Sequence, residues 1–170
     1  MSTGSPIVIR PERAGDKPAI RRLLDAAFAG PEEGQLVERL HANADLVLSL
    51  VALDGERIVG YVAWPRLWIE TPRDEYKGIA LAPLAVDPAQ QRRGIGSALT
   101  REGLTQLRAL GESIVFVLGD TVYYRRFGFS VEAASGYLST YAGAHFMALR
   151  LNEAAPSSGR VRYPTAFDAG

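Results

Sequence analysis

The stretch Leu84-Ala-Val-Asp-Pro-Ala-Gln-Gln-Arg-Arg-Gly-Ile-Gly-Ser-Ala-Leu99 decides the fold, because three structural signals follow one another within it. An apolar run from Ile79 to Val86 stops at Asp87-Pro88, since proline cannot donate to a strand ladder. Apolar residues at helical spacing then start at Ile95. The stretch therefore predicts a strand, a basic glycine-bearing turn and a helix that begins at the turn.

The turn is suited to binding an anion. The first backbone N–H groups of a helix have no partner within the helix and lie at the positive end of its dipole. Arg92 and Arg93 add positive charge at the same place, and Gly94 and Gly96 let a ligand approach the backbone closely. These features together predict a phosphate site.

The order of residues argues against two common phosphate-binding loops. A dinucleotide fingerprint needs a third glycine where this chain has Leu99. A Walker loop needs Gly-Lys-Ser/Thr, and residues 84–99 contain no lysine. A nucleotide-binding module is therefore disfavoured.

The segment resembles the Gln/Arg-x-x-Gly-x-Gly/Ala signature of the GNAT superfamily of acyl-CoA-dependent N-acetyltransferases, with Gln91, Gly94 and Gly96 at the matching positions. In that family the signature cradles the CoA pyrophosphate. The resemblance implies acetyl-CoA as cosubstrate. The residues that it assigns to cofactor binding here are Leu84, Ala85, Val86, Gln91, Arg92, Arg93, Gly94, Ile95, Gly96 and Ser97.

A second element supports the same family. The apolar run from Ser113 to Leu118 predicts a buried strand, and residues 123–129, Tyr-Tyr-Arg-Arg-Phe-Gly-Phe, follow it. They are similar to the Phe-Tyr-x-x-x-Gly-Phe element of GNAT proteins. The resemblance implies that Tyr124 is the general acid, whereas Tyr123 is expected to pack in the core.

Two residues of this second element complete the predicted cofactor set. Arg126 is added for its charge. Asp120 is added for its place near the start of the element, where it can also cap the short helix. Many relatives carry asparagine near that position, so Asp120 departs from the family pattern.

The chemistry implied by the resemblance is direct attack of an amine on a thioester, which needs no enzyme nucleophile and agrees with the absence of cysteine. Backbone N–H groups at Leu84 to Val86 are expected to polarise the carbonyl. No Asp, Glu or His lies between Ile79 and Val86. The general base therefore stays open between solvent and several dispersed residues, which are Glu32, Glu33, Glu70, Asp74, Glu75, Asp120 and His145.

Composition excludes several other classes. The 170 residues are 47% hydrophobic and 22% charged, as expected for one globular domain. The two histidines are isolated and cysteine is absent, so no metal is expected. The chain starts without a signal-peptide pattern and has no apolar run of membrane-spanning length, so a cytoplasmic location is expected.

Charge is balanced overall but uneven along the chain. Residues 88–128 hold six Lys/Arg against three Asp/Glu, which places a positive excess where a phosphate ligand is expected. With a net charge of zero and no long basic run, the chain shows no nucleic-acid footprint.

The predicted fold class is a single α/β (α+β) domain. Its sheet is expected to be GNAT-like, mixed and mostly antiparallel, with a central parallel strand pair and flanking helices. Strands are expected at 7–10, 46–53, 57–68, 79–86, 113–118 and 144–151, and helices at 16–28, 32–42 and 94–110. The N-acetyltransferase domain is placed at residues 1–151, followed by a loosely held C-terminal tail at 152–170.

The predicted function is acetyl transfer from acetyl-CoA to a primary amine. A catalytically idle acyl-CoA-binding or sensing domain is the alternative. The acceptor stays open among an antibiotic, a polyamine, an amino acid and a protein amino group, as does the use of longer acyl chains. A set of aromatic residues can line an acceptor pocket, the core or a homodimer face; it comprises Trp64, Trp68, Tyr76, Tyr137 and Tyr141.

Overall fold

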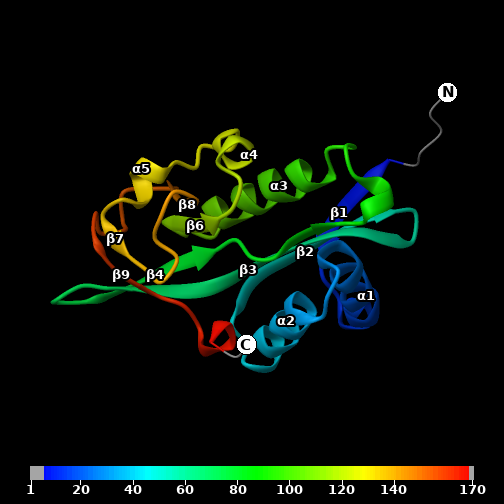
Figure 1. The fold of residues 1–170 in the computed structure, drawn as a ribbon, viewed down its shortest axis with the longest axis horizontal. Coiled ribbons are helices and arrows are strands. Elements are labelled where there is room, and N and C mark those ends of the chain that lie inside the picture. The colour runs from blue at the N-terminus through cyan, green and yellow to red at the C-terminus, as the bar shows by residue number, and fades with distance from the viewer. Residues whose placement is uncertain (1–5, 169–170) are drawn as a thin grey trace.

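One twisted sheet with helices on both faces forms the computed structural model, which describes residues 6–168 (Figure 1). The order across the sheet is β1-β2-β3-β4-β6-β8, with β5 and β9 also paired to β3, and β7 paired to β9. The strands are β1 (Ile7–Pro11), β2 (Leu46–Asp54), β3 (Arg57–Glu70), β4 (Glu75–Ala80), β5 (Leu84–Val86), β6 (Ile114–Leu118), β7 (Tyr137–Leu138), β8 (Phe146–Arg150) and β9 (Gly159–Arg162).

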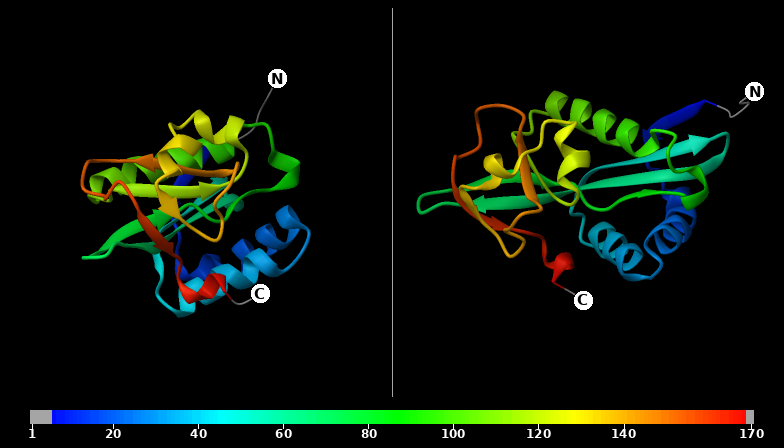
Figure 2. Two further views of the ribbon diagram at one scale, coloured as in Figure 1. Left: turned by 60° about the vertical axis from the view of Figure 1, so that its left-hand side comes forward. Right: turned by 45° about the horizontal axis from the view of Figure 1, so that its top comes forward.

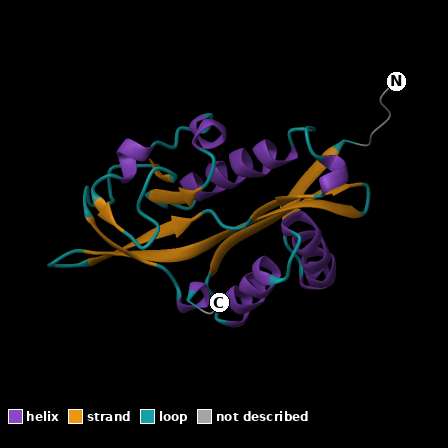
Figure 3. Ribbon diagram, in the orientation of Figure 1, coloured by secondary structure: helices purple, strands orange, loops and turns teal. Residues whose placement is uncertain are grey.

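The helices divide between the two faces of the sheet. The helices α3 (Ile95–Ala109) and α4 (Thr121–Arg125) lie on one face, and α1 (Lys17–Phe28) and α2 (Glu32–Ala42) lie on the other (Figures 1 and 3). A short α5 (Val131–Ala134) precedes β7. No helix among residues 6–168 is long and apolar enough to cross a membrane.

Apolar residues at helical spacing give each long helix one buried face. Ile20 and Leu24 of α1 pack with Val37 of α2 beneath β2 and β3, and Leu99 and Leu107 of α3 pack above the sheet. This is the amphipathic pattern expected of helices that cover a sheet. The two faces of the sheet thus bury separate apolar layers.

Gly103 allows α3 to lie close to the sheet. A Cβ at Gly103 would sit 2.1 Å from Cζ2 of Trp64, a side chain that is fully buried on β3. Glycine is unfavourable inside a helix by about 1 kcal/mol relative to alanine. Here the missing methyl group makes room for the indole ring.

The predicted fold class is confirmed, but the strand expected at 79–86 is two strands. The strand β4 runs parallel to β6, pairing Ile79 with Val115 and Ala80 with Phe116. The chain then leaves β6, and β5 pairs antiparallel with β3. Ala82 marks the change, since its N–H donates to the carbonyl of Ala63 on β3. The strand β5 therefore runs apart from β6, and a gap is left between these two strands.

The expectation of a loosely held tail is wrong for the described part of 152–170. The strand β9 pairs with β3 from Trp68↔Arg162 to Glu70↔Arg160, and Val161 is buried. A 3₁₀ turn at Thr165–Phe167 then lies beside α2, where the Arg39 side chain donates to the carbonyl of Ala166 (Figure 2). The strand at 146–150 is consequently not the last one. Residues 169 and 170 lie outside the described part.

Candidate functional site

The basic turn has the conformation that its glycines and arginines suggest. Arg92 and Gly94 both have left-handed backbones, with φ of 70° and 75°. Gly94 is the N-cap of α3 and provides no side-chain cap for the helix. The first N–H groups of α3 are thus left available to a ligand at the positive end of a 15-residue helix.

Gly96 lets the first turn of α3 lie close to Tyr123 and Val86. A Cβ there would lie 3.0 Å from the hydroxyl oxygen of Tyr123 and 3.6 Å from Cγ2 of Val86. The Tyr123 hydroxyl also lies 3.4 Å from Oγ of Ser97. Glycine therefore keeps the backbone of the first helical turn open between β5 and α4.

A surface cavity of about 360 Å³ opens at the turn. Ten residues from β5, the turn, α3 and the α4 region line it: Leu84, Val86, Gln91, Arg92, Gly94, Ile95, Gly96, Ser97, Tyr123 and Arg126. Nine of them belong to the cofactor set predicted from the sequence. Segments separated by about forty residues in the chain thus meet at one anion-suited surface.

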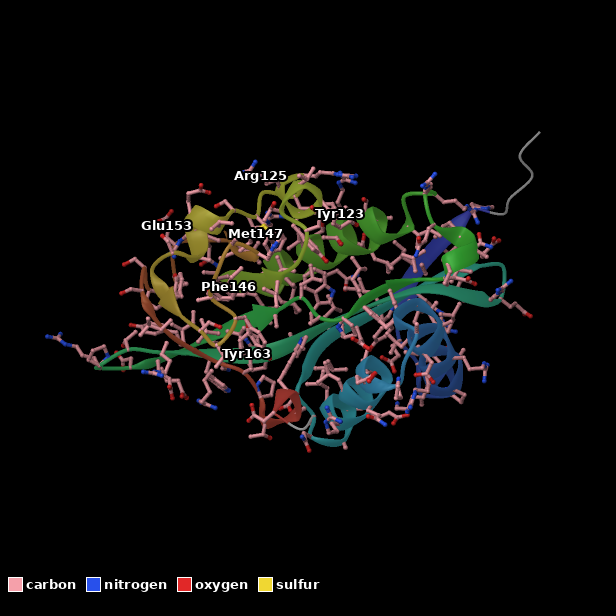
Figure 4. All side chains as sticks on the ribbon, viewed as in Figure 1. Tyr123, Arg125, Phe146, Met147, Glu153 and Tyr163 are labelled. Atoms are coloured by element: carbon pink, nitrogen blue, oxygen red, sulfur yellow. The ribbon has the colours of Figure 1, made fainter. Side chains whose placement is uncertain are left out.

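Tyr123 is the lining residue that the sequence interpretation missed. Its ring does pack against the core, as expected, but its hydroxyl reaches the turn and its other side carries the Arg126 guanidinium 4.9 Å above the ring centre. Figure 4 shows Tyr123 between α3 and α4. The sequence does contain a signal for this contact. Tyr123 is next to Tyr124, and adjacent residues on a helix point in different directions, so the two side chains are expected to have different neighbours.

Three members of the predicted set do not line the cavity. The Ala85 methyl group is buried in the opposite layer, with Ile20 and Leu23. Arg93 turns to Asp54, 3.1 Å away, and to the side chain of Gln90. Asp120 caps α4, because its Oδ1 accepts from the N–H groups of Val122 at 2.9 Å and Tyr123 at 3.3 Å.

The backbone of β5 alternates in the way a ligand-binding edge requires. The N–H of Ala63 on β3 donates to the carbonyl of Pro83, and the N–H of Asp87 donates to the carbonyl of Val59 on β3. The backbone groups of Pro83 and Asp87 therefore face β3. In an antiparallel ladder every second residue faces the partner, which places the N–H and C=O of Ala85 on β3 as well. The backbone groups of Leu84 and Val86 then point the other way, toward the gap beside β6.

Tyr124 lies deeper than Tyr123, with 9% of its surface exposed. Its ring meets those of Tyr123, Phe127 and Phe129, with centroids 4.9, 6.4 and 5.9 Å away. It also packs on Gly119, where a Cβ would be 2.7 Å from its Cε2. Burial is the main cause that raises the pKa of Tyr124 above its ordinary value of 10, and negative charge from Tyr123 and Asp120 adds to it. The phenol is therefore protonated throughout the neutral range.

The titratable groups near the cavity are few. None of its ten lining residues is Asp, Glu or His, and no group of metal-binding side chains was found among residues 6–168. The site therefore offers hydrogen-bond donors, positive charge and the Tyr123 hydroxyl. Such an arrangement suits a phosphate-bearing ligand.

The chain is similar to known acetyltransferases over most of its length. The family model described as an acetyltransferase (GNAT) domain matches residues 8–131. The uncharacterized N-acetyltransferase YhbS of Escherichia coli K12 is 34% identical over 167 residues, which cover 95% of this chain and 99% of that protein.

Two solved structures have the same fold over nearly the whole chain. A GNAT family acetyltransferase from Brucella melitensis, in complex with acetyl-CoA, is 38% identical with a TM-score of 0.82, over 96% of this chain and 99% of that one. YhbS from E. coli, in complex with CoA, is 31% identical with a TM-score of 0.87, over 99% of this chain and 95% of that one.

Proposed function

We propose, since the chain belongs to the GNAT family of acetyltransferases, that it transfers an acetyl group from acetyl-CoA to a primary amine without a covalent enzyme intermediate. The open first turn of α3, bounded by two left-handed residues and by Gly96, is the observation that carries this proposal. Titration calorimetry with acetyl-CoA and a thiol-release assay with a panel of amines test binding and turnover separately.

The cavity at the turn offers the positive charge and the first-turn N–H groups that the diphosphate of CoA would need. The N–H groups of Gly96 and Ser97 would face the phosphates, and Arg92 and Arg126 would supply positive charge from two sides. Arg93 holds the turn to the β2–β3 hairpin through Asp54. We assign Arg93 a positioning role, distinct from phosphate contact.

The exposed backbone edge of β5 would hold the pantetheine arm. The N–H and C=O groups of Leu84 and Val86 face the gap between β5 and β6, and amide groups of an extended arm can pair with them as a short strand would. The thioester would then lie near the start of the gap, beside Leu81 and Ala82. The N–H groups of Leu81 and Ala82 are already bonded to Phe116 and Ala63, so the N–H of Leu84, which faces the gap, is the group proposed to stabilise the developing oxyanion.

Tyr124 is proposed as the acid that assists departure of the thiolate. In the reaction a bond forms between the amine nitrogen and the acetyl carbon, the carbon–sulfur bond breaks, and the amine loses a proton to solvent. The sulfur receives a proton or a strong hydrogen bond from the phenol. A raised pKa makes the phenol a weaker acid, but the same burial also raises the proton affinity of a thiolate. The hydroxyl stays in its donating form at the pH of the reaction.

The experiment that tests this role is Tyr124→Phe, which removes one hydroxyl and keeps the buried ring. We expect kcat to fall by roughly 10²-fold, the lower range of general acid catalysis, while the Kd for acetyl-CoA changes little. Tyr61→Phe is the matched control, because Tyr61 is a buried tyrosine of β3 that packs in the layer of α1 and α2 and does not line the cavity at the turn. Thiol release under conditions where chemistry limits the rate is the measurement.

The two outcomes separate the enzyme from the sensing alternative. Unchanged kcat in Tyr124→Phe would refute the acid assignment. Tight acetyl-CoA binding without turnover of any amine would refute the enzymatic proposal and favour an acyl-CoA-sensing domain. The pH profile adds a check: because the pKa of Tyr124 is raised above 10, ionisation of this phenol should not lower the wild-type rate below that pH.

A further inference from the structure

A second cavity of about 200 Å³ lies at the end of the β4–β6 pair, on the side of the C-terminal segment. Its floor is formed by residues 80–82, at the end of β4 and just after it, and by residues 116–118 of β6. Its wall is three aromatic rings from the C-terminal part of the chain, Tyr141, Tyr163 and Phe167. Figure 4 shows Tyr163 well below Tyr123 in that view, and the two cavities share no lining residue.

The cavity lies where the strands part. The last link between β4 and β6 is the N–H of Leu81, which donates to Phe116 at 2.9 Å, and the next N–H, of Ala82, turns to Ala63. The cofactor-side cavity starts only two residues further on, at Leu84. A group held in the aromatic cavity would therefore reach the same gap.

The three rings of the aromatic wall pack on one another and remain partly exposed. Tyr141 and Tyr163 meet edge to face, with centroids 5.0 Å apart, and Tyr163 meets Phe167 at 5.2 Å. All three rings are half-buried, so part of each is free to contact a ligand. They lie beyond residue 131, where the match to the family model ends.

From these observations, and resting on the proposed acetyltransferase function, we infer that this cavity receives the acceptor, and that the acceptor is a primary amine on an apolar or aromatic body. The nine residues that line the cavity include no charged side chain. Such surroundings favour the neutral, attacking form of an amine over its cation. A polyamine would bury further ammonium groups there without a carboxylate partner, which is costly.

The size and continuation of the cavity narrow the acceptor further. A space of 200 Å³ is below the range that holds a whole drug-sized ligand, so it suits a small amine or the amine-bearing end of a longer one. A neighbouring cavity of 550 Å³ shares Tyr141, Tyr163 and Phe167 and continues past Ser139 and Thr140. Its carboxylates are Glu70, which is paired with Arg162 at 3.1 Å, and Asp168, and Arg160 lines it as well. The far part of a longer acceptor would therefore meet charged side chains of both signs there, outside the uncharged aromatic cavity.

The test compares three amines in the thiol-release assay: phenethylamine, spermidine and glucosamine. We expect kcat/KM for phenethylamine to exceed the other two by roughly 10-fold or more. Phe167→Ala should lower kcat/KM for phenethylamine by roughly 10-fold, chiefly through KM, and leave the KM for acetyl-CoA within about 2-fold. Phe167→Leu, which keeps an apolar side chain, should lie between Phe167→Ala and the parent. Phe28→Ala is the control, since Phe28 is 39% exposed on α1.

The failures of the two proposals are distinguishable. Preference for spermidine or glucosamine, or a Phe167→Ala variant with unchanged kinetics for phenethylamine, would overturn the acceptor assignment and leave the acetyltransferase intact. If no amine is acetylated, the enzymatic proposal fails. Calorimetry of phenethylamine with the CoA-loaded protein then tests whether the aromatic cavity binds an amine. Binding that is lost in Phe167→Ala would support the aromatic site, and absence of binding would overturn it.

Discussion

Gly96→Ala should separate cofactor binding from folding, because the added methyl group enters the cofactor-side cavity and little else. The new Cβ would lie 3.0 Å from the Tyr123 hydroxyl and 3.6 Å from Cγ2 of Val86. The contact with Val86 is ordinary, and the contact with the Tyr123 hydroxyl requires that side chain to give by only a few tenths of an ångström. The fold should therefore accept the methyl group.

The expected magnitudes have opposite signs for stability and for affinity. Alanine in place of a helical glycine stabilises by up to about 1 kcal/mol, so Tm should stay the same or rise by about 2–4 °C for a domain of this size. A phosphate kept from the N–H groups of the first turn loses one charge-assisted hydrogen bond, worth about 1.5–3 kcal/mol. That loss corresponds to a roughly 10- to 150-fold higher Kd for acetyl-CoA.

The assay is titration calorimetry with acetyl-CoA beside thermal unfolding of the free protein. Gly15→Ala is the matched control, because no heavy atom lies within 4 Å of its added Cβ and it is outside the cavity. A Gly96→Ala variant that binds acetyl-CoA within about 3-fold of the parent, with an unchanged Tm, would refute the assignment of the diphosphate to this turn.

The turn and the long helices could be predicted because their signals are local. The left-handed backbone at Gly94 is one that glycine adopts freely, and the start of α3 follows from the switch to apolar residues at helical spacing. The α2 helix has the predicted bounds, Glu32–Ala42. Each of these features is fixed by residues within a few turns of one another.

The break between β4 and β5 and the strand β9 could not be predicted, because both depend on distant partners. Proline interrupts a strand ladder, and Pro83 stands at this break, but the switch of the Ala82 N–H to a carbonyl of β3 is a pairing across the sheet. The strand Gly159–Arg162 has one buried apolar residue, Val161, and forms because the extended end of β3 offers it an edge. The local sequence preference for a strand does not reveal which distant segment it will pair with.

The site divides in the same way. Gln91, Gly94 and Gly96 belong to one short motif, so their proximity could be expected from the sequence. The contact of Tyr123 with the turn could not be predicted, because it depends on which side of α4 faces the turn. The direction of the Arg93 side chain could not be predicted either, because Arg93 donates to Asp54, which is 39 residues away in the chain. The aromatic cavity draws on Tyr141, Tyr163 and Phe167, which come together only through the pairing of β9 with β3 and β7.

Two predictions about stability remain. Gly103→Ala should destabilise the protein by about 1–3 kcal/mol, since its Cβ would overlap the buried Trp64 ring at 2.1 Å; denaturant unfolding measures this, and a stabilised variant would contradict the packing of α3 on β3. Asp16→Asn should lower Tm at pH 7, because two Arg10 nitrogens donate to the carboxylate at 2.7 and 3.0 Å. The hydrogen bond from Arg10 holds the pKa of Asp16 below its ordinary 3.8, so this stabilisation is fully present above that pKa and is lost as the pH falls through the lowered value. The Tm difference between Asp16→Asn and the parent should therefore shrink as the pH falls below 3.8, whereas a difference that stays constant on acidification would show that the ionised carboxylate is not the stabilising group.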